Sequence, residues 1–207
     1  MAVTISGSTG IASVDGSAGS PGSRGTDANS GVFYSADAIK FSTGGTERAV
    51  IDNNGLSAAG HVIQYVQATT GNINGRISTN DSSSFVTTGY SVTITPTNAS
   101  NLIIVGGYVT TYGSAINRGT YLQMHNGNTG SLDANQESGV YFKIEGPWLT
   151  LPFKYTCTAG TTSAITFTLY FKKYGGSSSS EYVYLGWSSS PGTTKNWNDM
   201  WAMEVAV

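Results

Sequence analysis

From His61 to the C-terminus, the sequence is a succession of short apolar segments separated by turn-forming residues. Such segments are typical of β-strands, and no window of eleven residues has the apolar spacing of an amphipathic helix. About nine segments predict an all-β fold with a C-terminal antiparallel β-sandwich of the jelly-roll type. They are His61–Ala68, Phe85–Thr95, Leu102–Val109, Tyr121–Met124, Val140–Ile144, Leu149–Thr158, Ile165–Phe171, Glu181–Trp187 and Trp201–Val207.

Two of these segments carry more specific expectations. Leu102–Val109 is almost continuously apolar, which predicts a strand buried on both faces. Within it, Gly106-Gly107 indicates a β-bulge rather than a phosphate-binding loop. The chain is apolar up to Val207, and because chain ends normally fray, this predicts a last strand docked in the sheet centre or at a subunit contact.

Composition supports the β-fold and excludes several functions. Charged residues make up 11% of the chain, against a usual value of roughly 25%, and Ser, Thr, Gly and Asn take their place, which suits strands and turns. The ten basic residues are scattered and the net charge is −2, so we expect no nucleic-acid binding. No apolar run is long enough to insert into a membrane, and no signal peptide is apparent. Cys157 is the one cysteine and is expected to be a small buried apolar residue.

Residues 1–30 are predicted to form an extended, Gly/Ser-rich anchoring arm. They contain too few apolar side chains to build a core. Gly16, Gly19, Gly22 and Gly25 recur at every third residue. Three close-packed extended chains require this period, because only glycine fits at their common axis. These glycines are therefore candidate trimerisation and anchoring residues, and a flexible or partner-bound coil is the alternative.

Residues 31–60 are predicted to form a short β-hairpin stalk or trimerisation unit. Residues 31–42 show a mostly alternating pattern, and residues 47–52 form a second short strand. Thr43–Thr46 and Asn53–Gly55 are turn signals. A hairpin is marginally stable alone, and repetition around a trimer axis would supply packing. The remaining residues, 61–207, are assigned to the β-sandwich head.

No residue pattern indicates an enzyme, a metal site or a cofactor. His61 and His125 have no partner at zinc-ligand spacing and no accompanying nucleophile motif. The carboxylates that could be proposed for glycoside hydrolysis are expected to be solvated surface charges. They are Glu137, Glu145, Asp199 and Glu204.

The C-terminal third concentrates aromatic residues, and this makes binding of a host surface glycan a hypothesis. Trp187, Trp197 and Asn198 are the candidate binding residues, because tryptophan can stack on a sugar while a neighbouring amide hydrogen-bonds its hydroxyls. The alternative is that these tryptophans cap the core or lie at a subunit interface, where aromatic residues are enriched.

Two motifs resemble a known group of proteins. Residues 39–56 are similar to the Thr-Glu-Arg-hydrophobic-Asp-x-x-Gly unit that precedes fibre heads, and residues 91–105 are similar to a hairpin of trimeric β-sandwich heads. Ala202–Ala206 also resembles the final strand of those heads. The chain thus resembles short trimeric tail-fibre and surface proteins of tailed bacteriophages, especially cyanophages.

This resemblance implies a homotrimer on the surface of the phage particle, with no catalytic residues. The N-terminal arm would attach to another virion protein, of the capsid or the tail, and the β-sandwich would point outward. The chain before the head is short for a tail fibre. Two roles therefore remain open beside the structural one: a glycan-binding receptor module and a capsid decoration protein.

Overall fold

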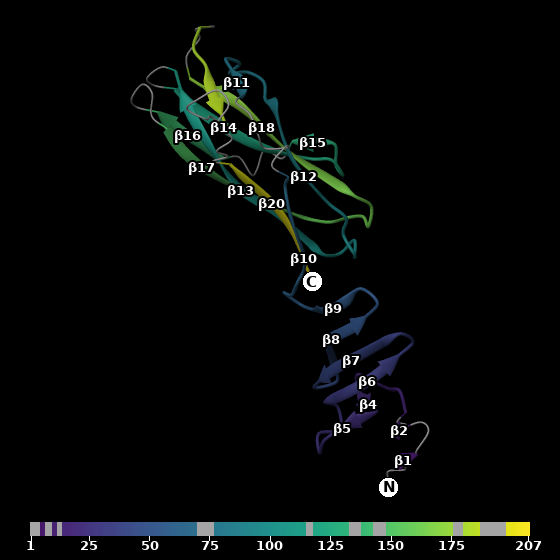
Figure 1. The fold of residues 1–207 in the computed structure, drawn as a ribbon. Coiled ribbons are helices and arrows are strands. Elements are labelled where there is room, and N and C mark those ends of the chain that lie inside the picture. The colour runs from purple at the N-terminus through teal and green to yellow at the C-terminus, as the bar shows by residue number, and fades with distance from the viewer. Residues whose placement is uncertain are drawn as a thin grey trace. The chain divides into compact units, whose positions relative to one another are not determined.

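Every regular element in the described part of the chain is a β-strand (Figure 1). The structure is a computed structural model that describes residues 5–6, 10–11, 14–69, 77–114, 118–132, 138–142, 148–175, 180–186 and 198–207. These ranges hold no helix that could cross a membrane. The all-β fold class is confirmed. The chain divides into an N-terminal unit, residues 1–63 with 205–207, and a head, residues 64–204.

The N-terminal unit is built around a five-stranded antiparallel meander, in which each strand pairs with the next. Its strands are β5 (Ser23–Arg24), β6 (Gly31–Ser35), β7 (Ala38–Thr43), β8 (Thr46–Asp52) and β9 (Gly55–Ala58). Two short hairpins precede it, formed by β1 (Ile5–Ser6) with β2 (Gly10–Ile11) and by β3 (Gly16–Ser17) with β4 (Ser20–Pro21).

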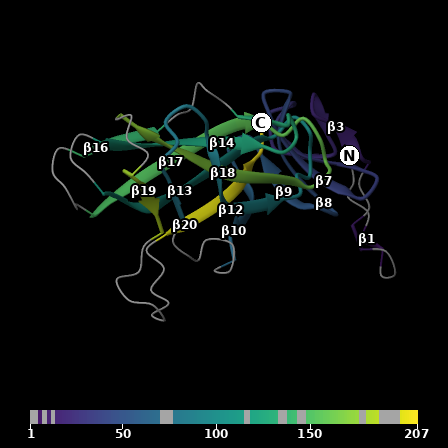
Figure 2. The ribbon, with the colours of Figure 1, turned by 90° about the horizontal axis from the view of Figure 1, so that it is seen from above.

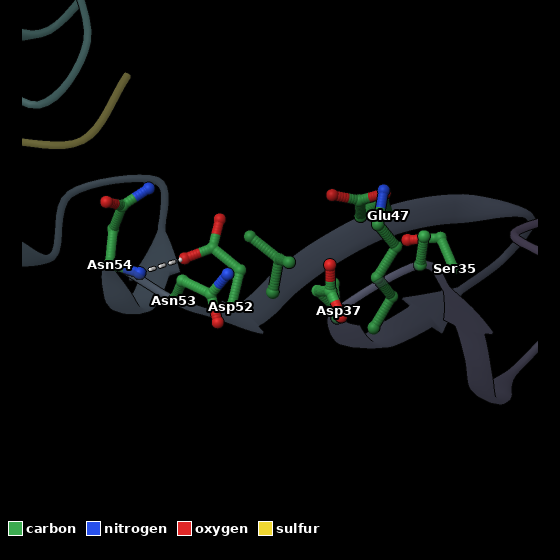
Figure 3. A pocket seen from close by; sticks show the side chains of 10 residues that line it. Ser35, Asp37, Glu47, Asp52, Asn53 and Asn54 are labelled. Carbon is green, nitrogen blue, oxygen red and sulfur yellow. Dashed lines mark hydrogen bonds and ion pairs between the residues drawn. The ribbon is translucent and has the colours of Figure 1, made fainter.

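The two predicted turns of this unit are confirmed, and a third turn was not predicted. Gly44 and Gly45 join β7 to β8 with φ of 59° and 76°, as a tight hairpin turn requires. At the turn after β8, the Asn54 backbone N–H donates to Asp52 Oδ1 at 2.8 Å (Figure 3). The third turn breaks residues 31–42 into β6 and β7 at Asp37, whose φ is 59°. The expected hairpin is therefore part of a larger sheet.

The described part of residues 1–30 folds into short strands rather than one extended arm. Gly16 has φ of 75°, which a three-chain bundle of polyproline type does not use. A Cβ on Gly22 would lie 2.0 Å from the Val14 carbonyl oxygen, whereas one on Gly19 or Gly25 would meet nothing within 4 Å. The local hairpin thus accounts for Gly16 and Gly22, but not for the other two glycines.

The head contains two antiparallel sheets (Figures 1 and 2). The first has the order β10-β20-β13-β19-β11, with β17 also paired to β13, and the second has the order β12-β18-β14-β15, with β16 paired to β14. The first consists of β10 (Val62–Gln67), β20 (Asp199–Val205), β13 (Leu102–Gly113), β19 (Val183–Leu185), β11 (Ile77–Thr79) and β17 (Trp148–Thr158). The second consists of β12 (Val86–Ile94), β18 (Ile165–Tyr174), β14 (Arg118–Asn126), β15 (Ser131–Leu132) and β16 (Ser138–Phe142).

All nine predicted segments of the head contain strands, and among the described strands of the head only the short β11 and β15 were not predicted. The last strand, β20, lies between β10 and β13, so the predicted central position of the C-terminal strand is confirmed. Beyond it, the Ala206 N–H donates to the His61 carbonyl oxygen at 2.9 Å. The apolar chain end is thus held by backbone pairing.

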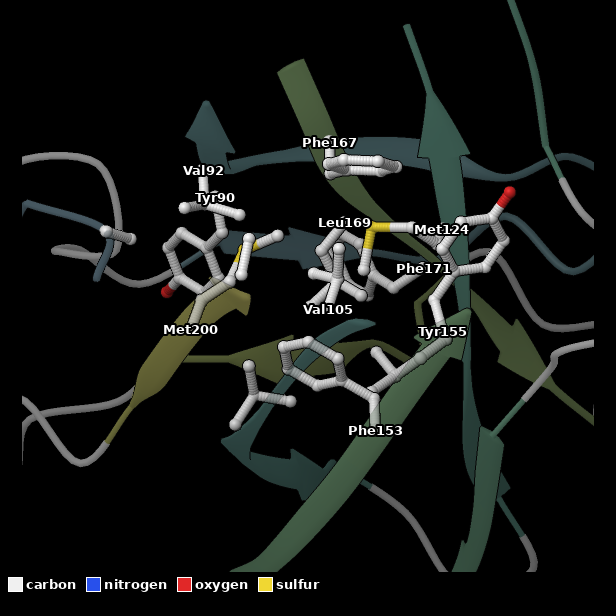
Figure 4. Packing of buried hydrophobic residues seen from close by; sticks show 14 of the residues in the cluster. Tyr90, Val92, Val105, Met124, Phe153, Tyr155, Phe167, Leu169, Phe171 and Met200 are labelled. Carbon is white, nitrogen blue, oxygen red and sulfur yellow. The ribbon is translucent and has the colours of Figure 1, made fainter. Parts of the chain in front are cut away.

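Alternate side chains of the two sheets form one hydrophobic core (Figure 4). Phe167 and Leu169 of β18 are at most 1% exposed, and Val105 of β13 is fully buried. The prediction that β13 is buried on both faces is wrong, because Tyr108 on its other face is 42% exposed. Cys157 is partly buried and packs against the core.

Gly106 and Gly107 do not form the predicted bulge with β17, because pairing between β13 and β17 is continuous through both residues. A Cβ on Gly106 would lie 2.6 Å from the Trp201 ring, and one on Gly107 would lie 2.0 Å from the Asp199 carbonyl oxygen. The glycines therefore allow β20 and its indole to lie close to β13.

Glu204 of β20 is fully buried, so the expectation of a solvated surface charge is wrong for this residue. Its carboxylate accepts hydrogen bonds from Gln64 Nε2 at 2.6 Å, Asn101 Nδ2 at 2.7 Å and the Thr97 N–H at 2.8 Å. Burial acts to raise the pKa of Glu204, but the hydrogen bonds from Gln64, Asn101 and Thr97 outweigh it and hold the pKa below its usual value. The carboxylate joins β10, β20 and the turn after β12.

Candidate functional site

One face of the N-terminal sheet is lined by apolar side chains from four neighbouring strands. Directly paired residues of antiparallel strands project to the same side, and so do residues two apart along a strand. The pairing register therefore places eight apolar residues on one face, which we call the uncovered face. They are Val32, Tyr34, Ile39, Phe41, Ala49, Ile51, Leu56 and Ala58.

None of these eight residues is buried within the chain. Ile39, Phe41, Ile51 and Leu56 are 43%, 38%, 41% and 47% exposed. Single exposed apolar residues are normal on a protein surface, but a contiguous apolar patch indicates an interaction site. The eight side chains of the uncovered face carry no charge. Arg48, at the bulge of β8, lies at the border of this face, where its Nε donates to Thr43 Oγ1 at 2.9 Å.

The opposite face of the same sheet has a different character. Phe33 is 6% exposed there, in the strand against which the β3–β4 hairpin packs. Lys40 Nζ lies 5.8 Å from the centre of the Phe33 ring and forms an ion pair of 3.0 Å with Glu47. Lys40 and Glu47 thus lie on the side away from the uncovered face.

An open hollow of about 410 Å³ lies on this charged side and is lined by the turns before β7 and after β8 (Figure 3). Asp37, Glu47 and Asp52 contribute carboxylates to it. The part of the chain that the structure describes contains no group of three or more His, Cys, Asp or Glu side chains that could hold a metal ion. The hollow therefore offers polar groups without a defined binding geometry.

Of the three residues predicted to bind a glycan, Asn198 lies in the described part of the chain. Trp187 and Trp197 lie outside the described residues. Asn198 is described and is 7% exposed. Its Oδ1 accepts from the Thr110 N–H at 2.9 Å, and its Nδ2 donates to the Tyr90 hydroxyl at 3.3 Å. Burial raises the pKa of Tyr90 to about 12, against the opposing effect of this hydrogen bond.

Asn198 thus organises the interior of the head in this structure, and its contact with a sugar stays a prediction. Glu137 and Glu145 also lie outside the described residues, whereas Asp199 is partly exposed on β20.

Sequence reasoning did not identify the uncovered face, although its signal is visible. Pairs of apolar residues two positions apart occur in four successive short segments, from Val32 and Tyr34 to Leu56 and Ala58. The sequence pattern does not show how the strands pair. The apolar pairs come to one side of a single sheet only because the chain turns at Asp37, and this turn was not predicted.

Comparison with known proteins leaves the family of this chain open. No protein-family model and no curated protein matches it. Similar solved structures include the infectious bursal disease virus VP2 subviral particle, with 12% identity and a TM-score of 0.40 over 82% of this chain and 46% of that chain. Infectious bursal disease virus of the Gt strain is another, with 12% identity and a TM-score of 0.39 over 82% of this chain and 48% of that chain.

Both are structures of a virus or a subviral particle, and this chain spans about half the length of the chains it matches. A likeness of this degree is too low to support a statement about role, which has to rest on the residues described above.

Proposed function

We propose that this protein is a non-enzymatic structural component of a phage virion, and that it is a homotrimeric fibre or surface protein. Its N-terminal unit would form the contact between copies and the attachment to another virion protein, and its β-sandwich head would face outward. The observation that carries this proposal is the uncovered face, which a single chain leaves exposed to water.

The chemistry of the uncovered face favours other copies of the chain as its partners. The face is apolar and uncharged at all eight positions, so the same faces of other copies can gather around a common axis without burying a charge from these positions. Burying its exposed side chains contributes about 25 cal/mol for each Å² removed from water. A contiguous apolar patch is rarely left in contact with water on a monomeric protein.

The trimeric state and the particle location are supported by the motif resemblance. Residues 39–56, which resemble the unit that precedes phage fibre heads, contribute Ile39, Phe41, Ala49, Ile51 and Leu56 to the uncovered face. The stretch that carries the resemblance therefore contains the four most exposed residues of the uncovered face, Ile39, Phe41, Ile51 and Leu56.

The mass of the full chain in solution tests the assembly, and labelling of particles tests the location. Light scattering at micromolar concentration should give three times the chain mass of 21.6 kDa, and a stable monomer would reject the assembly. An antibody raised against the protein should label intact purified particles. Cross-linking in those particles would then distinguish a tail fibre from a capsid decoration protein by the neighbour that is captured.

A second candidate function, binding of a host glycan, is favoured by a separate observation on the head. Tyr65 is 54% exposed and its ring lies beside that of Trp201, with the ring centres 6.1 Å apart. Adsorption to host cells should fall when this pair is disrupted.

A further inference from the structure

Tyr65 of β10, which is exposed, and Trp201 of β20, which is partly buried, form an aromatic pair on the outer side of the first head sheet. Their ring planes are inclined by 31°. Trp201 alternates along β20 with the core residues Met200 and Ala202, so its side chain projects away from the core. The pair therefore presents aromatic surface that the hydrophobic core does not use.

Gly106 sets the position of the indole. A Cβ at residue 106 would overlap the six-membered ring of Trp201, with Cζ2 at 2.6 Å and Cη2 at 2.8 Å. The absence of a side chain lets the indole lie close against the backbone of β13. On the same strand, Tyr108 follows two residues later and is 42% exposed. Tyr108 is thus a third aromatic residue on the outer side of this sheet.

Two polar side chains border this aromatic pair. Gln67 lies two residues from Tyr65 on β10, and Asp199 lies two residues from Trp201 on β20, so both project to the same outer side. Gln67 Nε2 donates to Asp199 Oδ1 at 3.0 Å. Partial burial and the nearby Asp199 charge both raise the pKa of Tyr65. One oxygen of Asp199 and the carbonyl oxygen of Gln67 are additional acceptors beside the rings.

We propose that Tyr65 and Trp201 form a platform that binds a pyranose ring of a neutral polysaccharide, with Gln67 and Asp199 accepting hydrogen bonds from its hydroxyl groups. A pyranose combines an apolar C–H face with a rim of hydroxyls, and this matches an aromatic pair bordered by acceptors. The inference rests on the second candidate function above and assigns it to residues other than Trp187, Trp197 and Asn198.

The outer side carries one charge of each sign, because the exposed Lys154 of β17 is paired with Gly106 and projects to the same side as Asp199. This balance favours a neutral saccharide over an anionic sugar. An anionic sugar would meet a carboxylate of the same sign. A neutral saccharide leaves the pair of Gln67 and Asp199 hydrated at the edge of the contact.

The test uses the full chain and three neutral probes: maltohexaose, cellohexaose and mannohexaose. Each is titrated while tryptophan fluorescence is followed, and binding is confirmed by calorimetry. We expect at least one probe to bind, Tyr65→Ala to weaken that binding by about tenfold, and Tyr65→Phe, which keeps the ring, to retain it. Tyr174→Ala is the matched control, because Tyr174 is 47% exposed on β18 of the other sheet.

Absence of binding to all three probes would overturn the platform, and so would Tyr65→Ala binding as tightly as the unchanged protein. A change of mass in Tyr65→Ala with unchanged sugar binding would instead identify the surface as a contact between copies. The saccharide-binding proposal and the trimer proposal can fail independently. Saccharide binding tests the platform, and the mass of the unchanged protein in solution tests the trimer.

Discussion

The head and the N-terminal unit use the same alternating pattern of apolar residues and reach opposite outcomes. In the head, the apolar side of each sheet meets the other, and Phe167 and Val105 between them are fully buried. In the N-terminal unit, Ile39 and Leu56 on the apolar side remain 43% and 47% exposed. Alternation of apolar and polar residues thus gives a sheet an apolar side. Whether that side is buried depends on whether a second sheet packs against it.

This difference gives the two units different requirements. The head has its own core, and its stability should not depend on protein concentration. The stability of the N-terminal unit should depend on concentration, because closing its apolar side takes more than one chain. The following predictions test that contrast, from the largest expected effect to the smallest.

Core truncation should affect the two units differently. Phe167→Ala should lower the free energy of unfolding of the head by about 3–5 kcal/mol at any protein concentration, because it leaves a cavity between the sheets. Phe41→Ala, at a residue that is 38% exposed, should leave the head unchanged and weaken the assembly. Guanidinium unfolding at two protein concentrations measures both effects. An equal, concentration-independent loss in both variants would contradict the contrast.

Removal of the buried carboxylate should be the next largest effect. Glu204→Ala leaves the donors of Gln64, Asn101 and Thr97 without their acceptor, and should cost about 3 kcal/mol. Glu204→Gln keeps the volume and one acceptor oxygen, so its loss should be smaller. Thermal unfolding of both variants measures the difference. Equal stability of Glu204→Ala and the unchanged protein would show that the network does not hold β20.

Two glycines in the same three-residue period should respond differently to alanine. Gly22→Ala places a Cβ 2.0 Å from the Val14 carbonyl oxygen, and should destabilise the N-terminal unit by about 1–3 kcal/mol. Gly19→Ala meets open space and should change stability by less than about 0.5 kcal/mol. Limited proteolysis of the N-terminal unit reports on both. A loss of similar size in both variants would favour three close-packed extended chains, which require glycine at every third position.

The smallest effect should be a pH dependence contributed by Glu204. Its pKa is lowered in the folded protein, so its contribution to stability is fully present above the pKa of the unfolded chain and is lost as pH falls through the folded pKa. The stability difference between the unchanged protein and Glu204→Gln should therefore shrink below the ordinary glutamate value of 4.5. Chemical unfolding between neutral pH and pH 3 measures this difference. A difference that grows with acidification would have the wrong sign.

The sequence predicted the strands of the head well, because each one is an apolar segment bounded by turn residues. It did not predict where backbones approach closely. Gly106 was predicted to form a bulge, whereas it makes room for the ring of Trp201, a residue far away in the sequence. Burial of Glu204 was missed for the same reason, since its carboxylate is held by Gln64, Thr97 and Asn101. Local patterns predict elements, and contacts across long separations decide burial.

The candidate surfaces were less predictable than the fold. The apolar pairs of the uncovered face are visible in the sequence, but placing them on one side needed the turn at Asp37, an aspartate in a left-handed conformation. Tyr65 and Trp201 come from opposite ends of the head segment, and only the position of β20 beside β10 brings them together.

The most direct test of the central claim compares the mass in solution of two variants that each add one carboxylate to the same sheet. Ile51→Asp places the charge on the uncovered face, and Ser57→Asp places it on the opposite face of the neighbouring strand. Light scattering should give three chain masses for the unchanged protein and Ser57→Asp, and one chain mass for Ile51→Asp. One common mass for all three proteins, or dissociation of both variants, would contradict closure of the uncovered face by other copies of the chain.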